Sequence, residues 1–246
     1  MGQITNDKNS CRSAQIIAMG GGGFLMEPDN LSLDQYILDA SGAATPKVCF
    51  VGTASGDAQS FIDRFYAAFT TLHCSPTHIS LFKPEPGDLR EKVLEQDVIY
   101  VGGGNTRNLL ALWREWEFDS ILREAWESGV VLAGVSAGSI CWFQQGLSDS
   151  VKPMELHALT CLGFLLGSNC PHYDGDPDRR STYQMFVAEG NMEAGYAADD
   201  GAALHFIGTK PVRAVCSRPA AKVYRVERQV EGALETPMEM ELLSPA

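Results

Sequence analysis

The chain has 246 residues, 45% of them apolar and 20% charged, which is enough to fill the core of one α/β domain. Its formal net charge of −12 argues against nucleic acid and anionic membrane surfaces as partners, because the long-range field repels them. Cysteines without paired spacing predict reduced, mostly buried thiols in a cytoplasmic protein and no zinc site. These cysteines are Cys11, Cys49, Cys74, Cys141, Cys161, Cys170 and Cys216.

The amino end of the chain is polar, and we expect residues 1–14 to form a flexible segment ahead of a single domain at residues 15–246. The apolar stretch Ile16–Met19 is too short for the core of a signal peptide. No window of the sequence reaches the length of a membrane span. These features predict a cytoplasmic location without a membrane partner.

Short apolar runs alternate with stretches of helical periodicity over the first 145 residues. The expected strands are Gln15–Met19, Lys47–Gly52, Thr77–Phe82, Asp97–Val101 and Val130–Val135. The expected helices are Leu33–Ala40, Ala58–Leu72, Asp88–Glu95, Asn108–Leu112 leading toward Trp116, Phe118–Glu127 and the helix-capable stretch Ser139–Gln145. The alternation predicts a three-layer α/β/α fold with a mostly parallel central sheet, and an active site at the carboxyl ends of its strands.

The pattern changes after about residue 145. Residues 148–200 are rich in loop-forming residues, with one helix expected at Thr182–Glu189. The carboxyl end predicts short strands, antiparallel at one edge of the sheet. These strands are Ala202–Phe206, Val212–Cys216 and Ala221–Val226.

A G-x-S-x-G pattern runs from Gly134 to Gly138 and centres on Ser136, where the strand Val130–Val135 ends. A serine at a sharp strand-to-helix turn presents its hydroxyl for attack, and small neighbours allow the turn to close. The following helix directs free amides toward developing negative charge. The same pattern occurs in ordinary tight turns, but its position after a buried strand favours Ser136 as a nucleophile.

A serine nucleophile needs a base to take its proton, and the chain has five histidines. His172 lies in a polar loop between Pro171 and Tyr173, and loops carry function more often than packing. We therefore expect His172 to be the base, although a surface loop residue is the alternative. The remaining four have less suitable surroundings: His73 and His78 near a middle strand, His157 in a helix-like run, and His205 in a strand.

A third group must orient the imidazole, and Asp199 and Asp200 precede the strand that starts at Ala202. Their position before Gly201 is also typical of an ordinary turn. The resulting order of Ser, His and Asp differs from the Ser, Asp, His order of the α/β-hydrolases. That family would require His205 as the base, so the sequence disfavours it.

Taken together, four stretches resemble peptidase family S51, the peptidase E and cyanophycinase group, whose fold is that of the class I glutamine amidotransferases. The likeness covers roughly residues 15 to 226, with matching order and spacing. The stretches are Val101–Thr106, Gly134–Ser139, Pro171–Asp174 with Arg180 downstream, and Asp199–Ala203.

The resemblance implies that Ser136 is the nucleophile and His172 the base. The acidic third member, commonly Glu in the family, falls at Asp200, with Asp199 as the alternative. The family's oxyanion hole corresponds to the backbone amide of Gly103 or Gly104 together with that of Ala137.

The glycine runs also permit an interpretation that does not depend on the resemblance. Gly102–Gly104 allows a ligand to approach the backbone closely, and Asn105 or Thr106 can cap the next helix. Neither glycine run has a phosphate-binding pattern, so Gly20–Gly23 is expected to form a turn near the site. We expect no cofactor and no metal.

The substrate follows from the resemblance as well, because peptidase E is best known for releasing amino-terminal Asp from short peptides, chiefly dipeptides. Binding an acidic side chain requires a cation, and Arg179 and Arg180 are the candidates, with Asn105 as a further substrate-binding residue. A solvated Asp/Arg loop is the alternative for the two arginines.

Three interpretations compete with a dipeptidase. The first is a cyanophycinase-like hydrolase, but cyanophycinases prefer Asp-Gln-His before the base, whereas Asn169, Cys170 and Pro171 precede His172. The second is a glutamine amidotransferase-like protein that binds a small metabolite without hydrolysing it. The third is an interaction module with a decayed site. We expect a monomer or a homodimer that acts on a small peptide.

Overall fold

The computed structural model describes residues 12–84 and 86–245. Cys11 and most of the segment expected to be flexible, residues 1–14, therefore lie outside the described residues. At the start of the described chain, Arg12 Nη1 pairs with Asp97 Oδ1 at 2.6 Å. Ala14 packs against the hydrophobic core.

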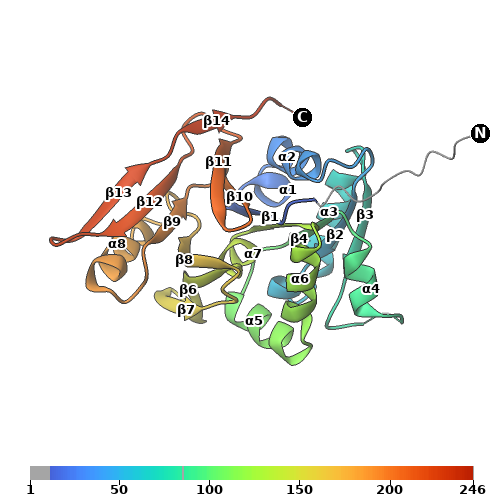
Figure 1. Ribbon diagram of the computed structural model, residues 1–246, viewed down its shortest axis with the longest axis horizontal. Helices are drawn as coiled ribbons and strands as arrows, with labels where there is room; N and C mark the ends of the chain where they lie inside the picture. The colour runs from blue at the N-terminus through green and yellow to red at the C-terminus, as the bar shows by residue number, and fades with distance from the viewer. Residues whose placement is uncertain (1–11, 85, 246) are drawn as a thin grey trace, which may run out of the picture.

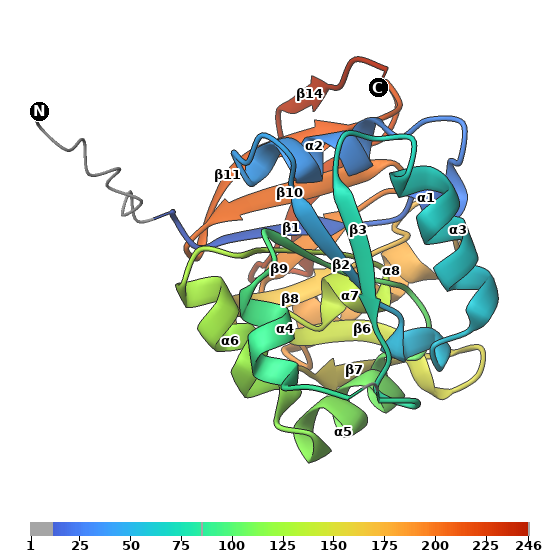
Figure 2. The ribbon, with the colours of Figure 1, turned by 90° about the vertical axis from the view of Figure 1, so that its right-hand side faces the viewer.

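An eight-stranded sheet, the first sheet, forms the centre of the molecule (Figures 1 and 2). Its strands in sheet order are β14 (Met240–Leu242), β11 (Lys210–Cys216), β10 (Ala202–Ile207), β1 (Gln15–Met19), β5 (Val131–Val135), β4 (Val98–Val101), β2 (Lys47–Val51) and β3 (Ser75–Ile79). The run from β1 to β3 is parallel, whereas β10 pairs antiparallel with both β1 and β11. The predicted mostly parallel sheet with an antiparallel edge is confirmed.

Helices cover both faces of this sheet. Successive strand residues point to opposite sides, so both faces carry apolar side chains that the helices bury. In β4, Val98 and Tyr100 join one apolar cluster while Ile99 and Val101 join the other. The first cluster lies under α1 (Gly23–Met26), α2 (Ser32–Ala40) and α3 (Gln59–Phe69). The second lies under η1 (Thr53–Ser55), α4 (Leu89–Leu94), α5 (Thr106–Glu115), α6 (Phe118–Glu127) and α7 (Ala137–Ile140).

A second sheet of six strands lies beside the first, on the left of Figure 1. Its strands in sheet order are β13 (Ala233–Pro237), β12 (Val223–Arg228), β9 (Gly195–Ala198), β8 (Leu165–Cys170), β6 (Phe143–Lys152) and β7 (Glu155–Thr160). α8 (Arg179–Glu189) packs on it through a separate apolar cluster that includes Tyr183 and Val187. Phe143 and Leu165 belong to the core of the first sheet, so the two sheets share a hydrophobic core.

Several expectations for this half of the chain were wrong. The helix-capable stretch Ser139–Gln145 is divided, because α7 ends at Ile140 and β6 begins at Phe143. His157 lies in strand β7 rather than in a helix-like run. Residues 148–200, expected to be mostly loop, contribute four strands to the second sheet. Their polar, half-exposed sequences lack the apolar runs of a buried strand, which is why composition alone suggested loops.

Two predicted strands also differ in detail. The strand expected at Thr77–Phe82 is β3, which ends at Ile79, and Phe82 is exposed in the turn that follows. The strand expected at Ala221–Val226 is β12, which belongs to the second sheet rather than to an edge of the first.

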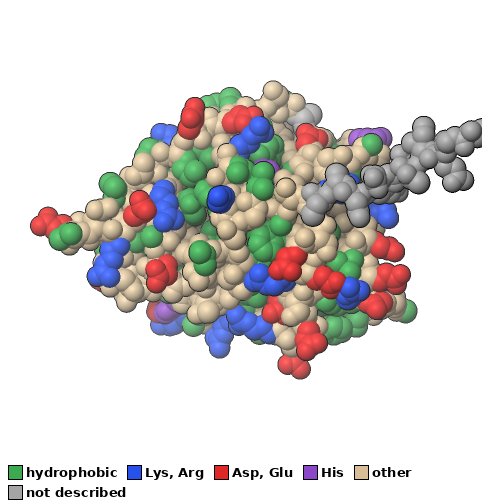
Figure 3. Space-filling model, in the orientation of Figure 1, with side chains coloured by type: hydrophobic (Ala, Val, Ile, Leu, Met, Phe, Trp, Pro, Cys, Tyr) green, Lys and Arg blue, Asp and Glu red, His purple; other side chains and the backbone are tan. Residues whose placement is uncertain are grey.

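The cysteines and the surface can also be compared with what the sequence predicts. The six described cysteines are free, and all except Cys74 are buried, which agrees with the expected burial of the thiols. Acidic, basic and apolar side chains are interspersed over the face shown in Figure 3. None of the described helices combines the length and apolar character needed to cross a membrane.

Candidate active site

Ser136 occupies the sharp turn that the G-x-S-x-G pattern predicts. It follows β5 and forms the N-cap of α7, with φ 57° and ψ −114°. Side chains at Gly134 and Gly138 would collide with backbone atoms of Gly138 and Val101, so the close approach of the turn requires glycine at both positions. The amide of Ala137 is at the first turn of α7, where it has no acceptor within the helix.

His172 comes from the second sheet, directly after β8 and Pro171. Its backbone has φ 52°, a conformation that is uncommon for a residue other than glycine. His172 Nδ1 lies 2.5 Å from Asp200 Oδ1, and the two side chains are 25% and 19% exposed. The ring is thus held by a carboxylate through one nitrogen, while Nε2 is left for another partner.

The segment from Met19 to Gly21 contacts all three of these residues. Met19 O accepts a hydrogen bond from Ser136 N at 3.4 Å, and Gly20 O accepts one from His172 N at 3.2 Å. A side chain at Gly21 would collide with Asp200 Oδ1 and would lie 3.0 Å from His172 Nδ1. The glycine turn expected near the site is therefore present, and it brings the three residues to one place.

The side chains of Ser136 and His172 are not hydrogen-bonded to each other in the described part of the chain. Their backbone amides nevertheless bond to consecutive carbonyls at the end of β1. Catalytic hydrogen bonds are often long in proteins without substrate and tighten only in the complex.

Asp200, not Asp199, is the carboxylate that contacts His172. This hydrogen bond is the main cause that lowers the pKa of Asp200 below its ordinary value, so the carboxylate stays ionised. Asp199 instead accepts a hydrogen bond from Lys222 N at 3.0 Å, and burial raises its pKa to about 6. The amide of Asp200 donates to Asp174 Oδ1 at 2.8 Å, which involves a residue of the Pro171–Asp174 stretch in the site.

The glycine loop after β4 lies next to Ser136. An added Cβ at Gly103 would be 3.3 Å from Ser136 Cβ and 3.7 Å from its Oγ. Gly104, with φ 140°, lies instead against the backbone of Ala54 in η1. Within residues 12–84 and 86–245, the amide of Gly103 donates to no backbone acceptor. Of the two glycines expected to supply an oxyanion amide in this loop, Gly103 is therefore the one placed next to Ser136.

Asn105, an expected substrate-binding residue, has a structural role in this loop. Its Oδ1 accepts from Asn108 N at 2.9 Å and caps α5, as the interpretation based on the glycine loop predicted. Its Nδ2 donates to Ser150 O at 3.3 Å. The oxygen and one N–H of the side-chain amide are therefore hydrogen-bonded within the protein.

Arg180, one of the two arginines expected to bind the substrate carboxylate, likewise has a partner inside the protein. Its guanidinium makes a two-point ion pair with Glu235 of β13 and lies over the rings of Tyr173 and Tyr224. Glu235 is only 13% exposed and also accepts from Tyr173 and Gln184. This arrangement ties α8 to the second sheet and balances the charge of Arg180 within the protein.

Arg179, in contrast, has no carboxylate partner among the described ion pairs. Its Nε is buried and has no hydrogen-bond partner among the described residues. The positive charge of Arg179 contributes to lowering the pKa of Asp200, so the guanidinium is close to the site. It also faces the thiol of Cys170, whose pKa is raised to about 12 mainly by burial.

Three residues near Asp200 were not anticipated from the sequence. Arg218 donates to Asp200 O and pairs with Glu27 Oε1 at 3.0 Å, while Ser217 Oγ donates to Glu27 Oε2 at 2.7 Å. The pairing of two neighbouring strands accounts for the position of Ser217 and Arg218. β10 and β11 pair antiparallel with Ala202 opposite Cys216, so the residues after β11 lie beside those before β10.

The remaining histidines have partners elsewhere. His205 Nδ1 contacts Tyr36 and its Nε2 contacts Gln15, and burial lowers its pKa to about 4. His78 Nδ1 lies 2.9 Å from the Tyr66 hydroxyl. The strand interpretation of His205 is confirmed.

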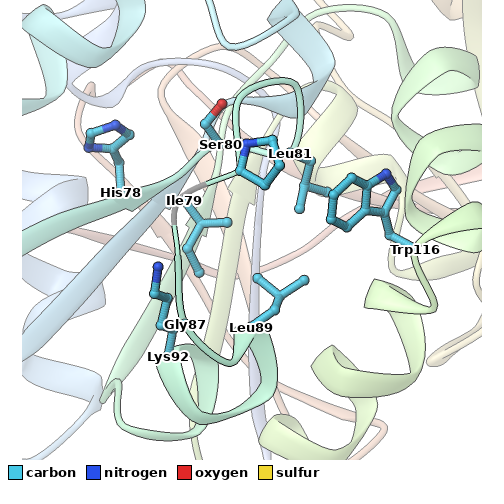
Figure 4. Close-up of a pocket in the computed structure, with 9 residues that line it drawn as sticks. His78, Ile79, Ser80, Leu81, Gly87, Leu89, Lys92 and Trp116 are labelled. Atoms are coloured by element: carbon cyan, nitrogen blue, oxygen red, sulfur yellow. The ribbon is translucent and has the colours of Figure 1, made fainter.

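A small cavity lies away from this site. Figure 4 shows it at the end of β3, where Leu81, Leu89 and Trp116 gather around a volume of about 70 Å³. None of the residues discussed for the active site lines it. Within the described residues, no three His, Cys, Asp or Glu side chains come together in an arrangement that could hold a metal.

Known proteins share both the sequence and the fold. A family model described as peptidase family S51 matches residues 16–213. "Uncharacterized peptidase YgaJ" of Bacillus subtilis (strain 168) is 59% identical over 229 residues, which is 93% of this chain and 99% of that protein.

Two solved structures are similar in fold. A peptidase from an acI-B1 Actinobacterium superposes with a TM-score of 0.67 at 18% identity, covering 93% of this chain and 98% of that one. A putative peptidase E protein from Listeria monocytogenes EGD-e gives 0.59 at 19% identity, covering 81% and 97%. The fold is therefore that of peptidase E-like proteins, in agreement with the predicted class I glutamine amidotransferase-like α/β/α architecture.

Proposed function

This chain belongs to peptidase family S51 and is a peptidase, and from the geometry of its site we propose that it is a serine-type dipeptidase with a Ser136, His172 and Asp200 triad. The observation that carries the proposal is the contact of one segment, Met19–Gly21, with all three triad residues. A nucleophile on a strained turn, a base, and an ionised carboxylate that orients the base are the elements that acyl transfer requires.

In the proposed reaction, Ser136 Oγ attacks the carbonyl carbon of the peptide bond while His172 Nε2 takes the hydroxyl proton. Asp200 holds the ring through Nδ1 and stabilises the imidazolium. The tetrahedral intermediate then collapses, the carbon–nitrogen bond breaks, and the imidazolium gives its proton to the leaving amine. A serine ester of the amino-terminal residue remains.

Water completes the reaction from the ester. His172 takes a proton from the water as its oxygen attacks the ester carbonyl, and this proton returns to Ser136 Oγ as the carbon–oxygen bond breaks. The products are a free acid and the regenerated enzyme, so every proton is accounted for without a cofactor.

The amides of Gly103 and Ala137 are proposed to stabilise the oxyanion in both steps. Gly103 lies beside the Ser136 hydroxyl, and Ala137 opens the helix that Ser136 caps. Donors that point at developing charge before the reaction begins cost no reorganisation, and each is typically worth about 3 kcal/mol of barrier.

The proposed substrates are dipeptides with amino-terminal Asp. The support is the resemblance to peptidase E together with Arg179, whose buried Nε has no partner among the described residues. A guanidinium can grip a carboxylate through two parallel hydrogen bonds, which favours Asp over an uncharged residue of similar size. Because Arg180 is neutralised by Glu235, Arg179 alone carries this part of the proposal.

We also propose a cytoplasmic location, supported by the free and mostly buried thiols of the described cysteines. Fractionation of cells that express the native chain tests it. Recovery of the protein in the membrane or extracellular fraction would contradict it.

The test of the activity is a panel of dipeptides that differ in the first residue, with Ser136→Ala as the inactive variant. We expect Asp-X to be preferred, and Ser136→Ala to lose turnover and labelling by a fluorophosphonate while it melts like the parent. Ser120→Ala, at an exposed position on α6, is the matched control and keeps full activity. A parent protein inert to every dipeptide and to the fluorophosphonate would instead support a non-hydrolytic binder.

A further inference from the structure

A network of three side chains surrounds the backbone of Asp200. Arg218 donates to Asp200 O through Nη2, and its Nε lies 3.0 Å from Glu27 Oε1. The other carboxylate oxygen of Glu27 accepts from Ser217 Oγ at 2.7 Å. Ser217 N donates to Gly201 O at 2.9 Å, so the loop after β11 bonds to Asp200 and Gly201, two of the three residues that connect β9 to β10.

Glu27 connects this network to the glycine turn. It is the C-cap residue of α1, which begins directly after the turn Gly20–Gly22. An added Cβ at Gly22 would lie 2.8 Å from Glu27 Oε2 and 3.1 Å from Gly201 Cα. The carboxylate therefore sits where the glycine turn meets the chain that follows Asp200, with 16% of its side chain exposed.

The backbone of Asp200 and Gly201 is held on several sides. Asp200 N donates to Asp174, Asp200 O accepts from Arg218, and Gly201 N donates to Gly21 O at 3.1 Å. The Asp200 side chain can then occupy few positions relative to His172 Nδ1. The contact through Arg218 differs from the other two, because it depends on a side chain that is itself oriented by Glu27.

We propose that Glu27 and Arg218 form a clamp that positions Asp200 against His172, with Arg218 making the contact and Glu27 orienting the guanidinium. The clamp rests on the proposed function, because it acts on the proposed triad. Neither residue touches the reacting atoms, so both are positioning residues.

The clamp would matter because general-base catalysis tolerates only a small displacement of the catalytic groups. A shift of about 1 Å in a catalytic group costs on the order of 100-fold in rate. Without Arg218, Asp200 O loses a charge-assisted hydrogen bond, and the turn at Gly201 can relax toward solvent. The carboxylate would then hold the imidazole less firmly, which lowers the turnover rate and leaves substrate affinity largely unchanged.

Several charged groups face Asp200, so removing the charge of Arg218 alone is expected to have a limited electrostatic effect on the Asp200 carboxylate. They are His172, Arg218 and Arg179, which favour its carboxylate form, and the buried Asp199, which responds to the charge of Asp200 and of Asp174. Loss of one positive charge leaves His172 and Arg179 in place. The effect of removing Arg218 is therefore expected to be mainly one of position.

The experiment compares Arg218→Gln, Arg218→Lys and Glu27→Gln with the control Arg213→Gln. Arg213 belongs to the neighbouring strand β11, has a similar exposure of 58% against 47%, and pairs with Glu241 at 3.6 Å without contacting the site. Four quantities are measured: kcat and KM on the preferred dipeptide, the rate of fluorophosphonate labelling, and the low-field proton resonance of His172 Nδ1–H. The His172→Ala variant assigns that resonance.

We expect Arg218→Gln to lower kcat about tenfold or more at nearly unchanged KM and to weaken or abolish the Nδ1–H resonance. Arg218→Lys recovers part of the loss, because an ammonium can still donate to Asp200 O. Glu27→Gln has a smaller effect of the same kind, and Arg213→Gln has none. Melting temperatures of the four variants show that the effect is not general destabilisation.

The outcomes separate this proposal from the proposed function. An active parent whose Arg218→Gln variant keeps both kcat and the Nδ1–H resonance overturns the clamp. An equal loss in Arg213→Gln overturns it too. If the parent is inert toward every peptide, the proposed function fails, and the resonance alone decides. Its loss in Arg218→Gln then supports the clamp, and its persistence contradicts it.

Discussion

The two sheets of this protein meet different constraints, and the site depends on both. In the first sheet, every residue of β4 and β5 is buried, because helices cover both faces. In the second sheet, β7 alternates between exposed and half-buried residues. The first sheet supplies Ser136, the proposed nucleophile, and the glycine loop, and the second supplies His172, the proposed base.

The comparison shows that the catalytic geometry depends on how the sheets are joined. Asp200 lies between β9 of the second sheet and β10 of the first, so it belongs to the connection itself. The end of β1 bonds to Ser136 on one side and His172 on the other. The first sheet alone would position the Ser136 hydroxyl, but it would not bring His172, the proposed base, next to it.

The largest effect is expected from removing His172, the proposed base that the second sheet contributes. His172→Ala should lower kcat by roughly 10³- to 10⁴-fold, because Ser136 then has no group to take its proton. The measurement is steady-state hydrolysis of the best dipeptide in the panel. His157→Ala, at a half-exposed position on β7 of the same sheet, is the control and should behave like the parent. Near-full activity of His172→Ala would show that the base lies elsewhere.

The next effect tests the contribution of the first sheet. Gly103→Ala places a methyl group 3.3 Å from Ser136 Cβ, and we expect kcat to fall by roughly 100-fold as the loop shifts away from the hydroxyl. Gly52→Ala is matched in crowding, since its methyl group would lie 3.2 Å from the Phe50 ring, but it is not next to Ser136. Equal losses of kcat in the two variants would remove the special role of Gly103.

A third prediction concerns a buried carboxyl that supports the glycine turn from within the first sheet's core. Asp34 is fully buried, and burial raises its pKa from 3.8 to about 7, although the nearby Tyr100 hydroxyl opposes the rise. Neither carboxyl oxygen has a partner with good hydrogen-bond geometry among the described residues. Between about pH 4 and 7 the folded protein thus binds a proton that the unfolded chain has released, so this group's contribution to stability falls as pH rises.

Asp34→Asn removes that titration. Relative to the parent, its free energy of unfolding should rise by roughly 2 to 3 kcal/mol between about pH 5 and 7, since each unit of pKa displacement is worth about 1.4 kcal/mol. His205, whose pKa is lowered to about 4, makes stability rise with pH over part of the same range. The difference between variant and parent, measured by urea unfolding, isolates Asp34. A difference that does not change with pH would contradict the prediction.

The smallest effect tests whether Arg180 stabilises the fold or contributes to substrate specificity. Arg180→Met should lower the free energy of unfolding by about 1 kcal/mol through loss of the ion pair with Glu235, without changing the preference for Asp-X. Arg90→Met, which breaks an exposed pair with Glu124 between helices α4 and α6, is the control and should cost less. A selective rise of KM for Asp-X in Arg180→Met would return Arg180 to the substrate site.

Much of the first half of the fold followed from the sequence. Strands covered on both faces are continuous apolar runs, and the run Val130–Val135 before Ser136 marked both a strand and a turn. The second sheet was missed because strands such as Glu155–Thr160 have one solvated side, and because Gln144 and Gln145 continue a helix-like stretch. Polar composition indicated loops where partner strands provided the missing hydrogen bonds.

By itself the sequence determined the turn at Ser136 and the glycine loop after β4, and it led to His172 as the proposed base, because these depend on local backbone requirements and on motif order. Only the tertiary structure decided that Asp200 rather than Asp199 faces the imidazole, that Arg180 is neutralised by Glu235, and that Arg218 reaches the backbone of Asp200. The contacts of Arg180 and Arg218 join residues that are distant in the chain. The contact with the imidazole required a choice between two adjacent residues. Strand register and the packing of one sheet on the other set such contacts, and neither can be derived from local spacing.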